Sequence, residues 1–501
     1  MKKLFVIALM LLGYSYVYSQ NYVGELWYMN SYQYVKLSCT KGQCELSLPY
    51  LDGAKKYPTQ GNPLQKKTWR IHTGLDTWTF DTRFANDQFT GLVTTYNGQQ
   101  QLTLTRQLDA LPKKELSKFK GIYKDRKGRK VVVYERFDFL HIISPYSEEI
   151  MSLKPIAKDT FWSVSGETST FKKLQNNKFL ELTIGFRDGR SHRLTRQPDS
   201  VIKELWIPVG KDTLYAKMYL PAGKGPFPAC LILPGGGPIG LENYEFEARF
   251  FAAYGIASLV FDKSGNGQSK GEGHFNFQTF EDKNEQYKKL FSYLKNHPKV
   301  NPDKVGIHGP SEGGRLALLM AIDLKEEVAF VNAIAAPVMP FREGQFYAMD
   351  QHHRILGVSE VHNMEIQQIW DEYYDGIVAG KINPKTIDKA RTHLKRNQQL
   401  FLPSSYELPA SPRKEDIENN KVVAMAHQIT TPIFFQNGEH DQRVNVPKSM
   451  ANFNKAFDKK ELVHSKIYWR GNHSLMTPEL KICPGYLQDK IKWLTTIGII
   501  H

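Results

Sequence analysis

Hydrophobic and polar residues alternate along the first two hundred residues of the chain. The segments TWTFDTRF (77–84), FTGLVTTYNGQQQLTLTRQ (89–107) and FLELTIGFRDGRSHRLTRQ (179–197) carry β-branched and aromatic residues at alternate positions, with Asn-Gly or Asp-Gly between runs. Such alternation predicts half-buried strands, and these dipeptides favour hairpin turns. We therefore expect residues 20 to about 200 to be all-β.

Two segments of this β-rich part share an ending. Residues 96–107 and 186–197 both run from a turn into a strand that closes with Leu-Thr-Arg-Gln, and their ends lie about 90 residues apart. A length of about 90 residues suits a small β sandwich or barrel. The repeat predicts two such domains, 20–110 and 115–198, joined near DALPKKELSK (109–118).

From residue 201 the pattern changes to strands that alternate with helices. Two leading runs (201–209 and 213–221) read as a hairpin, and amphipathic helical patterns such as TFEDKNEQYKKLFSYLKNH (279–297) then separate short apolar strands. This alternation predicts a mainly parallel sheet covered by helices on both faces. A polar, aromatic, helix-rich interruption at about 340–428 is too long for a plain loop, so we expect it to be an inserted cap.

The N-terminus has the features of a signal peptide, residues 1–19. Lys2 and Lys3 precede an apolar run (4–12), and a cleavage site follows with Gln20 as the mature start. The run is too short to span a bilayer, and no cysteine follows closely enough for a lipid anchor. We expect a secreted or periplasmic bacterial protein without stable membrane insertion.

The four cysteines fit that compartment. Cys39 and Cys44 bracket TKGQ within alternating β pattern, where either a disulfide across the hairpin or two free thiols would fit. Cys230 and Cys483 read as buried or isolated thiols. Because the chain has no C-x-x-C and no Cys/His cluster, we expect neither a metal nor a cofactor.

The formal net charge of +15 comes from lysines and arginines that are scattered along the chain. No basic patch is interleaved with aromatic residues, so we expect no nucleic-acid partner. A basic surface could attract anionic glycans or lipid headgroups, although a solvated surface needs no partner. The sequence sets no oligomeric state.

Gly309-Pro310-Ser311-Glu312-Gly313 has the pattern G-x-S-x-G. A nucleophilic serine on a sharp strand-to-helix turn requires small residues two positions to either side, because the backbones pack closely there. An apolar strand precedes this segment and a helical pattern follows it. We therefore predict that Ser311 is a nucleophile and that the Glu312 N–H points at the developing oxyanion.

A glycine-rich loop upstream could supply the second oxyanion donor. The segment LILPGGGPIG (231–240) follows an apolar strand, and glycines let the backbone approach a substrate oxygen. Either Gly236 or Gly237 is the candidate donor. A phosphate-binding loop would need the Lys-Ser/Thr ending that this segment lacks.

The acid and the base should follow the serine, each just past a late strand. Asp441 occupies such a place in FFQNGEHDQRVNVP (434–447), and His473 does so in IYWRGNHSLMTP (467–478). Glu439 and Asp371 are weaker candidates for the acid. The weaker candidates for the base are His440, His464, His352 and His353.

At these residues, 201–501 resembles the α/β-hydrolase superfamily and is most similar to its secreted bacterial serine esterases and S9/S33-like peptidases. The segment FDKSGNGQSKG (261–271) is similar to the D-x-R-G-x-G-x-S segment of that family, with Ser264 in place of the usual arginine. We interpret Asp262 and Gly267 as structural. The resemblance implies an α/β-hydrolase fold after two accessory β domains.

These observations lead to one principal functional hypothesis and three alternatives. The principal one is a secreted serine hydrolase that cleaves small carboxylic esters through an acyl-enzyme. The alternatives are an exo- or oligopeptidase acting on short peptides, with Glu312, Arg342 or Arg354 as charged anchors, an acyltransferase, and a non-catalytic glycan-binding protein. Five aromatic residues of the cap, Phe346, Tyr347, Trp370, Tyr373 and Tyr374, line the substrate pocket or else pack the cap itself.

Overall fold

The computed structural model describes residues 19–28, 31–48, 56–73, 77–95, 98–109, 111–136, 139–146, 149–163, 166–237, 239–271, 274–275, 278–408, 414–477 and 482–500. The predicted signal peptide lies outside these residues except for Ser19. The chain divides into two compact units, residues 1–197 and 198–501. None of the helices in the described part is both long and apolar enough to cross a membrane.

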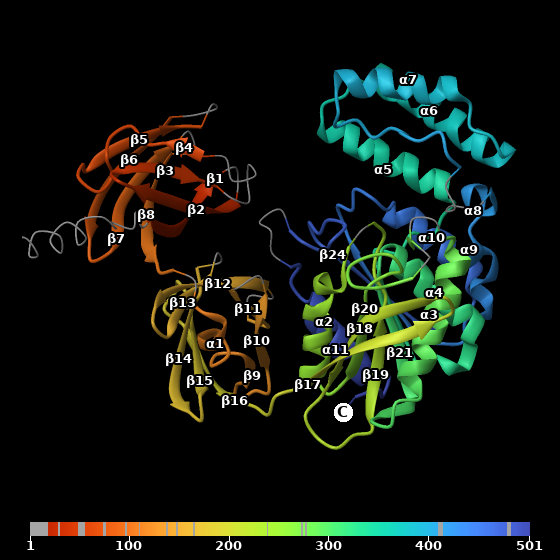
Figure 1. Cartoon of the computed structure of the whole chain (residues 1–501), viewed down its shortest axis with the longest axis horizontal. Helices are drawn as coiled ribbons and strands as arrows, with labels where there is room; N and C mark the ends of the chain where they lie inside the picture. Colours follow the sequence, from red (N-terminus) through yellow and green to blue (C-terminus); the bar gives the residue numbers. More distant parts are fainter. Residues whose placement is uncertain are drawn as a thin grey trace, which may run out of the picture. The chain divides into compact units, whose positions relative to one another are not determined.

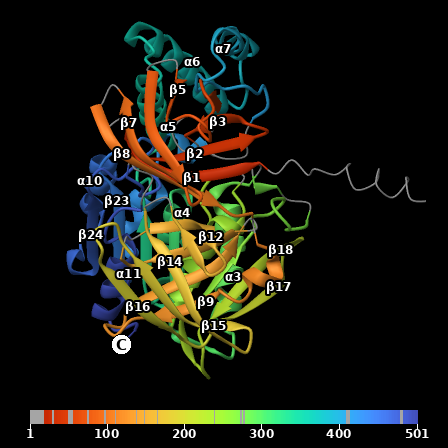
Figure 2. The same cartoon turned by 90° about the vertical axis from the view of Figure 1, so that its left-hand side faces the viewer.

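The first unit begins with an antiparallel sheet. Its strands are β1 (Gln20–Tyr28), β2 (Ser31–Thr40), β3 (Gln43–Ser47), β4 (Lys56–Pro58), β5 (Thr68–His72), β6 (Thr77–Ala85), β7 (Gln88–Thr95) and β8 (Gly98–Gln107), in the order β4-β3-β2-β1-β8-β7-β6-β5 (Figures 1 and 2). Backbone hydrogen bonds exchanged by Gln60 and Arg70 join the segment after β4 to edge strand β5. The sheet therefore curls back on itself around an aromatic core that includes Trp69, Trp78 and Phe80.

A closed barrel follows the sheet after a short helix, α1 (Lys113–Leu116). Its strands are β9 (Gly121–Lys124), β10 (Lys130–Arg136), β11 (Phe139–Ser144), β12 (Glu149–Ala157), β13 (Thr160–Trp162), β14 (Thr168–Gln175), β15 (Lys178–Gly185) and β16 (Ser191–Arg196). The repeated Leu-Thr-Arg-Gln ending has a structural counterpart: it closes β8 in the sheet and β16 in the barrel. Each of these last strands pairs antiparallel with the first strand of its own body, β1 or β9.

A disulfide bond joins Cys39 and Cys44 across the β2–β3 hairpin. The two residues are directly paired in the ladder, so the bond closes the tightest turn between these strands. This observation decides between the two possibilities that the sequence left open. Cys230 and Cys483 are free thiols and both are buried, as predicted.

The second unit is built on an eight-stranded sheet of order β17-β18-β20-β19-β21-β22-β23-β24. The strands are β17 (Val201–Val209), β18 (Asp212–Leu220), β19 (Phe227–Ile232), β20 (Ala257–Phe261), β21 (Val300–Pro310), β22 (Val331–Ile334), β23 (Ile433–Gly438) and β24 (Val463–Tyr468). The leading hairpin β17–β18 joins the sheet antiparallel. The strands β20, β19, β21, β22, β23 and β24 pair in parallel with one another, so their carboxyl ends share one edge.

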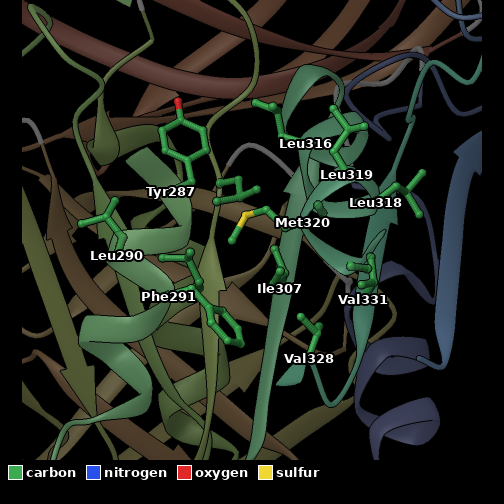
Figure 3. Packing of buried hydrophobic residues seen from close by; sticks show 14 of the residues in the cluster. Tyr287, Leu290, Phe291, Ile307, Leu316, Leu318, Leu319, Met320, Val328 and Val331 are labelled. Carbon is green, nitrogen blue, oxygen red and sulfur yellow. The ribbon is translucent and has the colours of Figure 1, made fainter. Parts of the chain in front are cut away.

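Helices cover both faces of this sheet. They are α2 (Glu245–Ala253), α3 (Phe280–Lys295), α4 (Glu312–Leu324), α9 (Lys421–Met425), α10 (Val446–Ala456) and α11 (Tyr486–Thr496), with single 3₁₀ turns at Leu241–Asn243, Lys325–Glu327, Ala426–Gln428 and Lys460–Leu462. On one face, Leu290 and Phe291 of α3 pack with Met320 of α4 and Ile307 of β21 (Figure 3). On the other face, α2 and α11 cover a second core around Phe251 and Trp493.

The predicted cap is helical. It comprises α5 (Phe341–Ile355), α6 (Glu360–Ala379), α7 (Pro384–Arg396) and α8 (Lys414–Glu418), of which α5, α6 and α7 lie together in Figure 1. Trp370, Tyr373 and Tyr374 are buried in a separate core of this cap, and Phe346 packs against it. These four aromatic residues therefore hold the cap together, which was one of the two roles that the sequence allowed.

Candidate active site

Ser311 lies on a sharp turn between β21 and α4. Its backbone has φ 56° and ψ −119°, a region that a residue with a side chain adopts only under strain. A Cβ atom added at Gly309 would lie 2.3 Å from the backbone of Gly313, and one at Gly313 would lie 2.8 Å from the Leu233 carbonyl oxygen. The two glycines of the motif are therefore required by close backbone packing, as the sequence predicts.

Asp441 and His473 lie together on the loops that follow β23 and β24. The Nδ1 of His473 is 2.9 Å from one Asp441 carboxylate oxygen and 3.0 Å from the other. Because a carboxylate only accepts hydrogen bonds, Nδ1 carries the proton and Nε2 is free to accept one. The Asp441 side chain is buried, and its Oδ1 also accepts the backbone N–H groups of Arg443 and Val444 at 2.8 Å each.

The rival acids have other partners. Glu439 accepts the backbone N–H of Arg470 at 2.9 Å, and Asp371 faces the guanidinium of Arg342 at 3.8 Å. Within the described residues, Asp441 is the carboxylate that is hydrogen-bonded to His473. The geometry therefore favours Asp441 as the acid.

The glycine loop approaches the serine turn. A Cβ at Gly235 would lie 3.8 Å from the Ser311 Cβ, and one at Gly236 would lie 3.5 Å from a Glu312 carboxylate oxygen. The Gly235 N–H donates to the Tyr244 hydroxyl at 2.8 Å, so it is already engaged. Gly237 has φ 76° and open space where a side chain would be. Gly236, which lies beside Glu312, is therefore the better placed of the two candidate donors.

Glu312 contributes differently through its backbone and its side chain. Its N–H is the first of helix α4 and has no intrahelical acceptor, as at any helix start. Its carboxylate accepts a hydrogen bond from the buried ammonium of Lys283 on α3 at 2.8 Å. This ion pair joins α3 to the serine turn.

The segment after β20 is hydrogen-bonded to the chain that follows the glycine loop. The Asp262 carboxylate accepts the N–H groups of Leu241 and Gln268 at 2.8 Å each, which agrees with the structural role expected of it. Gly267 lies so close that a Cβ there would meet the same carboxylate. Ser264, which stands where the related segment has arginine, donates to Asp212 at 2.5 Å.

A cavity of about 340 Å³ opens beside His473. Its walls come from cap helix α5 and from the loops that carry the acid and the base, and they include His352, Arg443 and Ser474. The cap also contacts the acid loop directly, because the Tyr347 hydroxyl donates to the backbone carbonyl of Asp441 at 2.8 Å. The cap thus borders the space next to the candidate base.

Two groups of side chains in the described part are close enough to share a metal ion. One is His362, Glu365 and His393 of the cap, and the other is Glu281, Glu285 and Asp323 on the surface of α3 and α4. Neither group contains a residue of the candidate active site.

The sequence did not reveal three contacts that shape the site. Tyr244 binds the Gly235 N–H, and the buried Lys263 donates to the carbonyl oxygens of Gly235 and Gly237. The third is the hydrogen bond from Tyr347. The signal available for Lys263 was its place directly after Asp262 at the end of an apolar strand, because a lysine there needs buried hydrogen-bond partners.

A family model described as BAAT / Acyl-CoA thioester hydrolase C terminal matches residues 285–488, a span that contains Ser311, Asp441 and His473. Together with the sheet order and the serine turn, this match decides the superfamily. The C-terminal unit belongs to the α/β-hydrolase superfamily. The superfamily expected from the sequence is thereby confirmed, and the matched family supports a hydrolase.

Among solved structures, this α/β-hydrolase unit resembles several at low identity. They include the α/β hydrolase GrgF from Penicillium sp. sh18 (16% identity, 60% of this chain and 98% of that chain, TM-score 0.39) and Est1E from Butyrivibrio proteoclasticus with ferulic acid bound (16%, 58% and 96%, 0.38). Another is a proline iminopeptidase from Mycobacterium smegmatis (13%, 59% and 96%, 0.37). Such identities and TM-scores carry no information about the substrate. No curated protein matches the chain.

Proposed function

We propose that the α/β-hydrolase unit is a serine hydrolase that cleaves carboxylic esters through an acyl-enzyme intermediate. The observation that carries this proposal is the hydrogen-bonded pair of Asp441 and His473 at the carboxyl edge of the sheet. The strained turn at Ser311 lies at the end of β21 in the same sheet. A serine, a carboxylate and a histidine in this chain order serve acyl transfer in this fold.

In the proposed reaction, the Ser311 hydroxyl oxygen attacks the ester carbonyl carbon while His473 Nε2 takes the hydroxyl proton. Asp441 stabilises the resulting imidazolium, and the N–H groups of Glu312 and Gly236 donate to the oxyanion. The C–O bond to the alcohol then breaks, and His473 returns the proton to the leaving oxygen. Water, deprotonated by the same histidine, then attacks the acyl carbonyl carbon. The bond to the Ser311 oxygen breaks, His473 returns the proton to that oxygen, and the carboxylic acid leaves.

The charged residues that could anchor a peptide terminus are already paired within the protein, and this pairing favours ester substrates over peptides. Glu312 is paired with Lys283, Arg342 donates to Asp375 at 2.5 Å, and Arg354 donates to Asp350 at 2.8 Å. Each anchor proposed for a peptidase therefore already has an internal partner. A cavity of about 340 Å³ lies at the small end of the range for ligand pockets, which suits a short acyl or alcohol group.

Acyl thioesters are a second candidate substrate class. The description of the matched family model names an acyl-CoA thioester hydrolase. With a thiol as the leaving group, the steps through Ser311 would be the same as for an ester. An acyl-enzyme could also pass its acyl group to an added alcohol or amine, which would make the protein an acyltransferase.

We further propose that the protein acts outside the cytoplasm. The disulfide between Cys39 and Cys44 supports this location, because such bonds persist in oxidising compartments. The basic N-terminal leader in the sequence supports it independently.

Paired rate measurements test the reaction class. We expect kcat/KM on p-nitrophenyl butyrate to exceed that on aminoacyl-p-nitroanilides by orders of magnitude, with butyryl thioesters measured alongside and Ser311→Ala as the inactive control. Faster cleavage of the anilides would replace the esterase proposal by a peptidase. Binding of glycans without turnover of any of these substrates would leave only a binding protein.

A further inference from the structure

Lys263 is a fully buried lysine that contacts the candidate oxyanion loop. It follows Asp262 at the end of β20, and its Nζ donates to the carbonyl oxygen of Gly235 at 2.8 Å and to that of Gly237. Within the described residues its hydrogen bonds go to these two carbonyls and to no carboxylate, since Glu312, the nearby acid, is bonded to Lys283. A buried ammonium is costly unless its donors are used, so this placement ties Lys263 to the loop.

The direction of the Gly235 carbonyl sets the direction of the next N–H. The peptide unit is planar and trans, so the Gly235 carbonyl and the Gly236 N–H point to opposite sides of the chain. A cation that holds the carbonyl therefore also fixes the N–H. The hydrogen bond from Lys263 further polarises the peptide and makes its N–H a stronger donor.

A loop of three successive glycines needs such support. Glycine has no side chain to restrict its backbone, so Gly235, Gly236 and Gly237 would otherwise sample many conformations. Lys263 holds the first and the last of them by their carbonyls, and Tyr244 holds the first by its N–H. Among the residues that the structure describes, none accepts a hydrogen bond from the Gly236 N–H, which lies between these anchors.

We propose that Lys263 is a positioning residue of the oxyanion hole, which holds the glycine loop so that the Gly236 N–H faces the oxygen formed by attack of Ser311. This inference rests on the proposed function of the same site. It adds a residue whose protonation state controls how well the hole is formed.

Several groups face the Lys263 ammonium from the elements packed around it. They are the charged side chains of Glu312 on α4 and Lys283 on α3, and the Phe275 ring, whose centroid lies 4.4 Å from Nζ. The imidazole of His274 stacks on that ring. Burial is the largest influence and lowers the pKa of Lys263 to about 8; Glu312 raises it and Lys283 lowers it.

The sign of the pH effect follows from this. The protonated lysine makes the charge-assisted hydrogen bonds, so the loop is held below the pKa of Lys263 and loosened above it. We therefore expect kcat to fall as the pH rises through about 8. A neutral amine can still donate, so the fall is partial rather than complete.

The test compares Lys263→Met and Lys263→Gln with Lys288→Met, a matched loss of a half-buried lysine on α3 that pairs with Glu285 and with Asp323 of α4. On p-nitrophenyl butyrate we expect Lys263→Met to lower kcat by about 10- to 100-fold with little change in KM, because a misplaced oxyanion donor acts on the transition state. Lys288→Met should match wild type. The fall of kcat with rising pH that we expect for wild type should be absent in both Lys263 variants. Their kcat should be low and should not change over the same pH range.

The wild-type profile tests the proposal even if a variant does not fold. A wild-type kcat that stays flat from about pH 7 to about pH 9.5, with the fold intact by circular dichroism, would overturn the role of Lys263. So would a folded Lys263→Met protein with wild-type kcat. Fluorophosphonate labelling at Ser311 is a separate readout. Its absence would contradict the proposed function rather than the role of Lys263.

Discussion

Replacing Asp441 by asparagine tests how the acid fixes the histidine. The Asp441 Oδ1 accepts two backbone N–H groups at 2.8 Å each, and His473 Nδ1 lies 2.9 Å from Oδ2 and 3.0 Å from Oδ1. The two backbone donors keep the amide oxygen of asparagine at the Oδ1 position. Its NH₂ group then takes the Oδ2 position, the nearer of the two to Nδ1, and donates to Nδ1, which favours the ring proton on Nε2. A histidine in that tautomer cannot accept the Ser311 proton.

We expect Asp441→Asn to lower kcat by about 10³- to 10⁴-fold with little change in KM. At 1.36 kcal/mol for each factor of ten, this is a loss of about 4 to 5.5 kcal/mol of transition-state stabilisation. The thermal midpoint should change little, because both backbone hydrogen bonds to the side chain are kept. Hydrolysis of p-nitrophenyl butyrate and thermal unfolding measure the two effects on the same samples.

Glu439→Gln is the matched control for this experiment. Glu439 lies two residues away on the same loop, and its carboxylate accepts the Arg470 N–H rather than a ring nitrogen of His473. Its loss should leave kcat unchanged. If Asp441→Asn kept more than about a tenth of the wild-type kcat, or if Glu439→Gln lost as much, the assignment of the acid would be refuted.

Two further substitutions probe the serine turn and the N-terminal unit. Gly313→Ala places a methyl group against two carbonyls of the glycine loop, so we expect kcat to fall about 100-fold. Gly344→Ala is the control, because the nearest atom to its methyl group would be 3.5 Å away, and it should have the kcat of wild type in the same assay. Equal activity of the two variants would contradict the close packing at the turn. Replacing Cys39 and Cys44 together by serine opens a bond between residues five positions apart and should lower the unfolding free energy of the first unit by about 2 kcal/mol. Calorimetry would detect this, while kcat should not change; an unaltered unfolding transition would count against a stabilising role.

The sequence predicted much of the catalytic unit because its informative features are local. The spacing of Gly309 and Gly313 around Ser311 reflects a turn that only glycine permits, and this constraint can be read from five residues. Asp441 and His473 could be placed because each follows a strand, and the carboxyl ends of parallel strands meet at one edge. Local pattern was therefore enough for the elements and for the pairing of Asp441 with His473, whereas the triad with Ser311 stays a prediction.

Contacts between distant segments could not be predicted in the same way. Lys263 reaches the carbonyls of residues 26 and 28 positions earlier, and Tyr347 reaches the carbonyl of Asp441, 94 positions later. These hydrogen bonds depend on how loops and the cap approach each other in three dimensions. The roles of Trp370 and Tyr374 also stayed open, because an aromatic residue in a cap can face either a substrate or its own core.

The β-rich part shows the same division. Alternation and turn residues predicted strands, and the shared ending at Gln107 and Gln197 predicted two bodies. The closure of the barrel rests on pairing between β9 and β16, which are separated by most of that body and share no sequence signal. Pairing of this kind is set by the global register of the sheet rather than by either strand alone.

Covalent trapping of the nucleophile is the most direct test of the central claim. Wild-type protein treated with a fluorophosphonate probe should carry one adduct, which peptide mass spectrometry should locate on Ser311. Ser311→Ala should not react, and Asp441→Asn should react far more slowly than wild type. An unlabelled wild-type protein, or an adduct on any other residue, would contradict the claim that Ser311 is the nucleophile.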